Sequence, residues 1–227
     1  MERTDDLGNG YKIIQDTDCF CFGTDSVLLS DFAVVKYKQK VLDLCSGNGI
    51  IPILLCAKSR VEDITGIEIQ ESSYNLAVKN CKLNNLENRI KFINDDVKNA
   101  FKYFESGKVD VITCNPPYMT DGSGFHNCTD SKTIARHEIL ITFDEIAKIS
   151  SKLLKFGGKM YIVHRCDRLC DIICSMRNYG IEPKRLQMIH PSYDAAPNMF
   201  LIEGISGAAA SLKIEKPLYL HKEGTDE

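Results

Sequence analysis

The sequence lacks several features that would assign it to a specialised class of protein. It has no excess of positive charge: its 28 lysines and arginines face 31 acidic residues, for a net charge of −3. Any nucleic-acid partner must therefore be held by a local basic patch. There is no internal repeat or low-complexity segment, no apolar run long enough to span a membrane, and no apolar core in the charged first residues that would suit a signal peptide.

The Cys-x-x-Cys motif is also missing, although the chain has ten cysteines. Several of them sit inside apolar runs, as small core residues do. Cys166, Cys170 and Cys174 share one helical face downstream of His164, but thiols in line on one helix cannot complete a tetrahedral metal site. We therefore expect a half-buried helical stripe at these positions, free thiols, no metal and no membrane partner. Free thiols indicate that the protein resides in a reducing compartment, so we expect it to be cytoplasmic.

The chain alternates between predicted strands and helices, and its 227 residues suffice for one α/β domain. Alternation of this kind requires crossover connections, which build a mostly parallel sheet with helices on both faces. We predict a Rossmann-like, seven-stranded sheet that closes with an antiparallel hairpin. Predicted strands cover 41–45, 64–69, 90–96, 109–115, 159–164, 185–190 and 198–205, and helices cover 50–58, 72–83, 143–154 and 168–179. We divide the chain into an entry segment (1–40), a main domain (41–206) and a tail of the same domain (207–227). The entry segment is predicted to contain a short strand over 11–16 and a helix over 26–35, and the tail a short strand over 211–214.

Acidic residues end three successive predicted strands, at the edge where sheets of this kind bind ligands. They are Asp43, Glu68 and the pair Asp95-Asp96. The turn over 46–49 adds two glycines, which allow backbone to approach a ligand, and the free N–H groups of a helix start. Glu68 lies 21 residues beyond Gly47 and can accept both ribose hydroxyls, while an acid after the third strand can accept an adenine amino group.

The glycine turn alone would also suit an NAD-binding fold. Two details argue against that cofactor. Pro52 occupies the third glycine position of the dinucleotide motif, and Asp43 lies inside the strand before the turn. A carboxylate there opposes a pyrophosphate but suits a ligand that carries a sulfonium and an ammonium group. We therefore predict S-adenosylmethionine as the cofactor and S-adenosylhomocysteine as its product.

The apolar run 109–114 ends in Asn115-Pro116-Pro117-Tyr118, where we expect the chemistry. The prolines stop the strand and hold the carbonyls and the ring in place. Such a cluster suits a planar amine: the Asn115 oxygen and the Pro116 carbonyl would accept its two N–H groups, and Tyr118 would stack on it. A nucleobase would have to leave its own stack to reach this position.

These motifs resemble the class I methyltransferases that modify amino nitrogens. Further stretches resemble one family within that class, the bacterial tRNA(Val) adenine-N6 methyltransferases. They are Gln15, the run 20–29 with Thr24-Asp25, Ala135-Arg136-His137-Glu138, His190-Pro191, the run 201–204, and Lys216-Pro-Leu. The resemblance implies methylation of the adenine next to the anticodon, with the anticodon stem-loop of a tRNA as partner.

The resemblance also implies roles for individual residues. The expected catalytic residues are Asn115, Pro116 and Tyr118, and the expected substrate contacts are Pro117, Tyr118, Arg136 and His137. The expected cofactor contacts are Thr24, Asp25, Asp43, Cys45, Ser46, Gly47, Asn48, Gly49, Glu68, Ile69, Asp95, Asp96, Val97 and Asn115. Capping of a helix would equally explain Thr24 and Asp25, and an ordinary surface pair would explain Arg136 and His137.

Three other functions fit the same motifs. Release-factor glutamine methyltransferases use the same Asn-Pro-Pro-Tyr, but that family carries an added N-terminal helical domain for which the segment before Val41 is short. The motif also permits methylation of guanine N2 or of adenine in DNA. A non-catalytic RNA-binding module is the remaining alternative, and an intact Asn115-Pro-Pro-Tyr118 argues against it.

Overall fold

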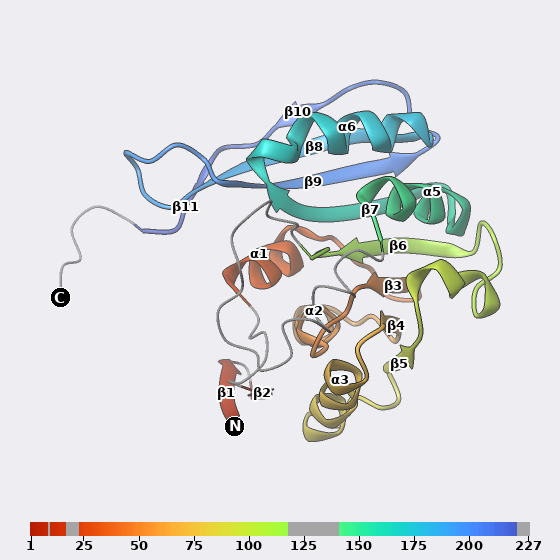
Figure 1. The fold of residues 1–227 in the computed structure, drawn as a ribbon, viewed down its shortest axis with the longest axis vertical. Helices are drawn as coiled ribbons and strands as arrows, with labels where there is room; N and C mark the ends of the chain where they lie inside the picture. Colours follow the sequence, from red (N-terminus) through yellow and green to blue (C-terminus); the bar gives the residue numbers. More distant parts are fainter. Residues whose placement is uncertain (9, 17–22, 118–140, 222–227) are drawn as a thin grey trace.

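The computed structural model describes residues 1–8, 10–16, 23–117 and 141–221 (Figure 1). A nine-stranded sheet runs through this part of the chain in the order β10-β8-β9-β7-β6-β3-β4-β5, with β11 also paired to β8. The strands are β3 (Lys40–Leu44), β4 (Asp63–Glu68), β5 (Ile90–Asn94), β6 (Val109–Cys114), β7 (Leu154–Arg165), β8 (Ile181–His190), β9 (Met199–Ser206), β10 (Lys213–Ile214) and β11 (Leu218–Tyr219).

The predicted fold is confirmed in its main features. Strands β3 to β7 pair in parallel, and β9 lies antiparallel between β7 and β8. These account for the seven predicted strands, and the two short strands β10 and β11 extend the sheet beside β8. The described part of the tail, 207–221, therefore contributes two short strands to the sheet edge.

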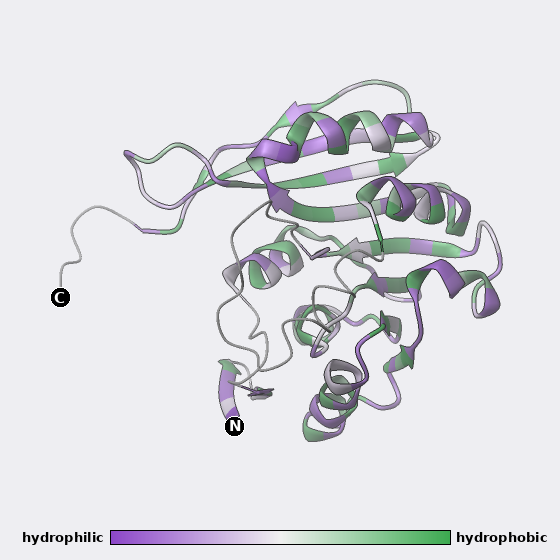
Figure 2. Ribbon diagram, viewed as in Figure 1, coloured by the Kyte–Doolittle hydropathy of each residue, from purple (hydrophilic) through white to green (hydrophobic). Residues whose placement is uncertain are grey.

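Two layers of helices cover the sheet, as Figure 1 shows. The helices are α1 (Thr24–Phe32), α2 (Ile50–Lys58), α3 (Glu71–Leu83), α5 (Phe143–Leu153) and α6 (Leu169–Asn178), with 3-10 turns η1 (Val97–Lys102) and η2 (Cys166–Arg168). One core lies between the sheet and η1, α5 and α6, and the other lies between the sheet and α1, α2 and β2. The ribbons of β6 and β7 are largely apolar in Figure 2, because both of their faces are covered.

One strand was missed, and two others begin earlier than predicted, each for a physical reason. A two-stranded hairpin of β1 (Glu2–Gly8) and β2 (Tyr11–Asp16) precedes α1, and β1 was missed because its polar residues show no apolar alternation. β8 begins before Pro183, since a register shift between Pro183 and Arg185 accommodates the proline. β7 likewise begins at Leu154 rather than at the predicted 159, with a register shift against β6 between Val109 and Val111.

Candidate active site

The predicted site residues gather at one edge of the sheet. Strands β3, β4, β5 and β6 are parallel, so their carboxyl ends at Leu44, Glu68, Asn94 and Cys114 point the same way. The turn after β3 crosses to β4, where the Ser46 amide donates to the Ile67 carbonyl at 3.0 Å and the Gly47 amide donates to Glu68 Oε2 at 2.8 Å. The glycine turn and the acid at the end of β4 therefore form one structure.

The glycine turn requires its glycines for two different reasons. Gly49 has φ +83°, and a Cβ there would lie 2.7 Å from the Phe92 ring and 3.2 Å from Ala77. Gly47 has φ +53° with open space where a Cβ would point, so a ligand can approach its backbone. Cys45, just before the turn, has φ +58°, which is uncommon for a residue with a side chain and marks a constrained position.

A buried asparagine that was not among the predicted site residues holds this turn in place. Asn80 of α3 is fully buried, and its Nδ2 donates to the carbonyls of Asn48 and Ile14, both at 3.0 Å. Its oxygen accepts from the Ile14 amide at 2.6 Å. Within the described ranges, Asn48 Nδ2 is a buried donor without an acceptor, which suits an oxygen or nitrogen of a bound ligand.

Two buried carboxylates, Asp43 and Glu68, face this turn. Asp43 is fully buried and accepts from the hydroxyls of Ser46 and Thr113, the latter at 2.5 Å. Burial, with a smaller effect of the nearby Glu68, raises the pKa of Asp43 to about 7 despite these two donors. Burial also raises the pKa of Glu68, against the backbone amides of Gly47 and Gln70 that donate to it.

No lysine or arginine in the described part of the chain forms an ion pair with Asp43 or Glu68. A buried carboxylate without a positive partner is costly, and a ligand with positive charge would relieve that cost. The site therefore suits the cationic cofactor that the sequence predicts better than it suits a pyrophosphate.

The Asn115 side chain is oriented by the first turn of α1. Its Nδ2 donates to Asp25 Oδ2 and to Ser26 Oγ, both at 3.0 Å. A carboxylate cannot donate, so the nitrogen of the amide must face Asp25, and the oxygen Oδ1 is the acceptor end on the other side. Asp25 is itself buried and receives the Ser26 amide at 2.8 Å. Asp25 thus lies beside Asn115, at the active-site end of α1.

The acids after β5 take different roles in the local structure. Asp95 accepts from Asn99 Nδ2, the Tyr103 hydroxyl and the Asp96 amide, all at 2.7 Å, and these hydrogen bonds lower its pKa to about 2. Asp96 caps η1, where its Oδ1 accepts from the Lys98 amide at 2.9 Å. Asn94 ties this segment to the end of β4 by donating to the carbonyls of Glu68 and Ile69.

The remaining predicted residues differ in exposure to solvent. Thr24, Ile69 and Pro117 are exposed, whereas Val97 and Pro116 are buried. Tyr118, Arg136 and His137 lie outside the described residues.

Sequence reasoning missed the polar residues that support the site, namely Ser26, Asn80, Asn94 and Thr113. Thr113 carried a usable signal, since a polar residue inside a strand buried on both faces needs a hydrogen-bond partner. Ser26 and Asn80 carried none, because their partners lie 89 and 66 residues away in the chain.

The cysteines and helices give two further observations. The seven cysteines within the described ranges are free thiols, and no group of three or more His, Cys, Asp and Glu side chains there could hold a metal ion. Cys170 and Cys174 are more exposed than expected, because α6 turns Ile172 and Met176 toward the sheet instead. Among the described helices, none is long and apolar enough to cross a membrane.

Comparison with known families assigns the chain to a class of enzyme. The methyltransferase small domain family matches residues 12–171, which include the glycine turn, Glu68 and Asn115. The chain belongs to this methyltransferase family. Its relatives include proteins named tRNA1(Val) (adenine(37)-N6)-methyltransferase. The one from Bacteroides thetaiotaomicron is 33% identical, covering 85% of this chain and 79% of the relative. The one from Parabacteroides distasonis is 30% identical, covering 85% and 80%.

Solved structures of other methyltransferases share the fold. A predicted O-methyltransferase from Agrobacterium tumefaciens aligns with a TM-score of 0.70 at 20% identity, covering 89% of this chain and 90% of its own. The geranyl diphosphate C-methyltransferase of Streptomyces coelicolor, solved with S-adenosylhomocysteine, aligns with a TM-score of 0.60 at 10% identity, covering 80% and 76%. The methyltransferase thus has the α/β architecture of its class, with the site at the carboxyl ends of the strands.

Proposed function

We propose that this methyltransferase transfers a methyl group from S-adenosylmethionine to N6 of an adenine in a tRNA. The observation that carries the proposal is the orientation of Asn115, whose amide nitrogen is held by Asp25 and Ser26 so that Oδ1 is the acceptor end. The names of the relatives support the adenine and the tRNA, and they favour the anticodon loop as the region modified. With free thiols and no membrane-spanning helix in the described residues, the cytoplasm is the compartment we infer.

The residues at the strand ends suit the parts of the cofactor. Glu68 would accept the ribose hydroxyls, and Asp96 would accept the adenine amino group, since the oxygens of Asp95 are engaged by three donors of its own turn. Ile69 and Val97 would contact the faces of the adenine. The turn from Cys45 to Gly49, with Asp43 beneath it, would hold the methionine end, and Thr24 and Asp25 would lie near that end from α1.

The chemistry at Asn115 is mainly positioning. S-adenosylmethionine supplies an electrophilic methyl group. Asn115 Oδ1 and the Pro116 carbonyl would accept the two N–H groups of the adenine, which aims the nitrogen lone pair at the methyl carbon. Tyr118 would stack on the base, with Pro117 beside it, and Arg136 and His137 are proposed to contact the base or its phosphate. The target base would be turned out of its stack to reach this position.

The test is transfer of labelled methyl groups to unmodified total tRNA. We expect the label in N6-methyladenosine, and label recovered in protein or in another nucleoside would contradict the proposal. Replacing Asn115→Ala should lower kcat by at least about 100-fold, a loss typical of removing one positioned donor or acceptor. Calorimetric titration with S-adenosylhomocysteine provides the control, because the variant should retain binding within a few-fold. Retained activity in N115A would contradict the proposed role of the amide.

A further inference from the structure

A cluster of aromatic side chains lies where β8 and β11 end, outside the site described above. The His190 and Tyr219 rings have centroids 5.0 Å apart, and the Tyr219 and Tyr193 rings are 5.4 Å apart. We call these three residues the aromatic platform. Tyr193 is 67% exposed and lies in the loop between β8 and β9, so a large aromatic ring is presented to solvent.

Backbone pairing and hydrogen bonds hold the aromatic platform in place. β11 pairs with β8 so that Tyr219 lies opposite His190, and the amides of Leu220 and His221 donate to the carbonyls of His190 and Pro191. The His190 ring is fixed as well, because its Nδ1 lies 2.8 Å from the Ala195 carbonyl. This pairing places the His190-Pro and Lys216-Pro-Leu stretches side by side, although neither contributes to the cofactor site.

The aromatic platform faces the same edge as Asn115. β8 runs parallel to β7 and β6, because β9 is antiparallel to both β7 and β8, so their carboxyl ends lie together. In Figure 1 the loop between β8 and β9 and the end of β6 point to the same side. From β6 to β11 there are four strand spacings, roughly 19 Å. A nucleic acid bound at Asn115 could therefore reach the aromatic platform within a few nucleotides.

One basic residue lies between the two positions. Arg165 ends β7, opposite Met199, and Met199 is also the partner of Ile189, the neighbour of His190. The Arg165 side chain is 47% exposed, with Asp167 at 3.7 Å. Asp194 is exposed in the loop itself, which disfavours a phosphate there and favours contact with the face of a base.

We infer that the aromatic platform binds an unpaired base of the RNA, a few nucleotides from the target adenine, by stacking on Tyr193 and Tyr219. Single-stranded loops present such bases, and proteins take them up on aromatic side chains. This partner also suits a protein with a net charge of −3, since stacking does not depend on a positive field. The inference rests on the proposed function for the kind of substrate, which is a tRNA loop.

The experiment measures binding and transfer separately, with an unmodified anticodon stem-loop RNA as the probe. Replacing Tyr193→Ala should weaken RNA binding by about 5- to 150-fold, the loss of one base stack. It should raise KM for the RNA while kcat and S-adenosylhomocysteine binding stay within about twofold. Tyr193→Phe, which keeps the ring, should bind as the wild type does. Tyr37→Ala is the matched control, because Tyr37 is also exposed, at 54%, but precedes β3 and so lies at the opposite edge of the sheet.

The outcomes separate this inference from the proposed function. If the wild type methylates the RNA and Y193A matches Y37A in both binding and KM, the aromatic platform is not a binding site although the function stands. If the wild type binds the RNA through Tyr193 but transfers no methyl group to it, the inference stands and the proposed function fails. Absence of both binding and transfer would overturn both.

Discussion

At the scale of single residues, the orientation of one amide is the central feature of this methyltransferase. Asn115 could present either end of its amide to a substrate, and only the nitrogen can face Asp25 and Ser26. The strand end and the prolines were sufficient to select Asn115 as a candidate, and the structure places it at the carboxyl ends of the strands beside Asp25. They were not sufficient to predict its support, because α1 reaches it from about 90 residues earlier in the chain.

Replacing Ser26→Ala tests that support. The variant removes an acceptor of Asn115 Nδ2, so the amide is held less firmly, and kcat should fall about 2- to 10-fold, the value of one hydrogen bond. KM for the RNA and S-adenosylhomocysteine affinity should change little. Ser30→Ala is the control, since Ser30 is buried in the same helix and donates to the Val27 carbonyl instead. Equal losses of kcat in both variants would mean that α1 is only perturbed in general.

The buried Asp43 makes a prediction about pH. Its pKa is about 7 in the folded protein against an ordinary value of 3.8, so the folded state holds an extra proton between those pH values. The contribution of Asp43 to stability therefore falls as the pH rises from about 4 to 7 and is lowest above 7. Asp43→Asn has no such charge, so its melting temperature relative to the wild type should increase between pH 5 and pH 8. Thermal unfolding without cofactor measures this difference, and a constant difference across that range would contradict the buried charge.

The same variant separates stability from binding. At pH 8 the wild type carries a charged Asp43 that suits a cationic cofactor, and Asp43→Asn does not. The variant should therefore bind S-adenosylmethionine more weakly than the wild type at pH 8, while the two should bind more nearly alike at pH 6. Calorimetric titration at the two pH values provides the comparison.

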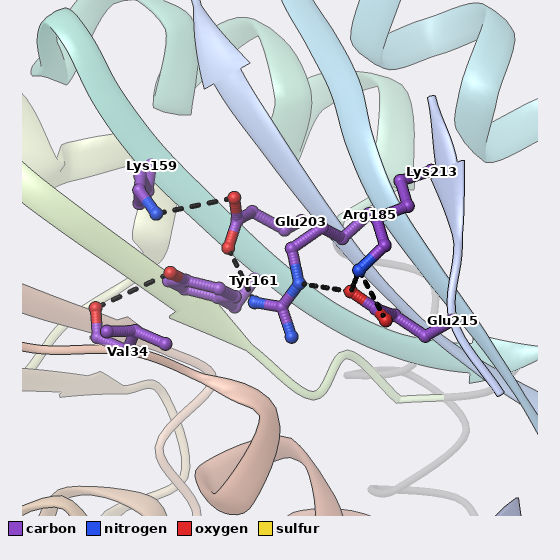
Figure 3. Close-up of polar contacts among 7 residues, drawn as sticks. All are labelled: Val34, Lys159, Tyr161, Arg185, Glu203, Lys213 and Glu215. Atoms are coloured by element: carbon purple, nitrogen blue, oxygen red, sulfur yellow. Dashed lines mark hydrogen bonds and ion pairs between the residues drawn. The ribbon is translucent and has the colours of Figure 1, made fainter. Parts of the chain in front are cut away.

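At the scale of elements, a network of charges joins the antiparallel hairpin to α1. Glu203 of β9 is only 4% exposed and pairs with Lys159 at 3.3 Å and Arg185 at 3.0 Å, as Figure 3 shows. Arg185 also pairs with Glu215 at 3.1 Å, and its guanidinium lies 4.3 Å from the Phe32 ring centroid at the end of α1. The helix that orients Asn115 is thereby packed against the half of the sheet that carries the aromatic platform.

Removing the centre of this network should destabilise the fold. Glu203→Ala leaves Lys159 and Arg185 partly buried without their shared acceptor, and the free energy of unfolding should fall by about 1–3 kcal/mol. Asp171→Ala serves as the control, because its pair with Arg168 is exposed and should contribute less than about 1 kcal/mol. Urea unfolding of both variants gives the two values, and equal losses would contradict a structural role for the network.

At the scale of the whole molecule, the alternation of strands and helices was enough to predict the sheet. The central strands are buried on both faces and so appear as continuous apolar runs, which left little ambiguity over 41–45 or 109–115. Contacts between distant segments have no periodic pattern. The sequence alone therefore could not predict the Glu203 network, the pairing of the tail with β8 or the hydrogen bonds of Asn80.

The strand order has a consequence for how such an enzyme can diversify. β6 lies at the centre of the sheet, with the strands of the candidate cofactor site, β3 to β5, on one side and the strands that lead to the aromatic platform, β7 to β11, on the other. On the inferred role of the aromatic platform, mutations on the second side would alter which RNA is accepted while the residues proposed to hold the methyl donor are preserved. A lineage could therefore exchange one RNA target for another by changing the loop between β8 and β9 and the segment after β9, with Asn115 as the fixed point between the two halves.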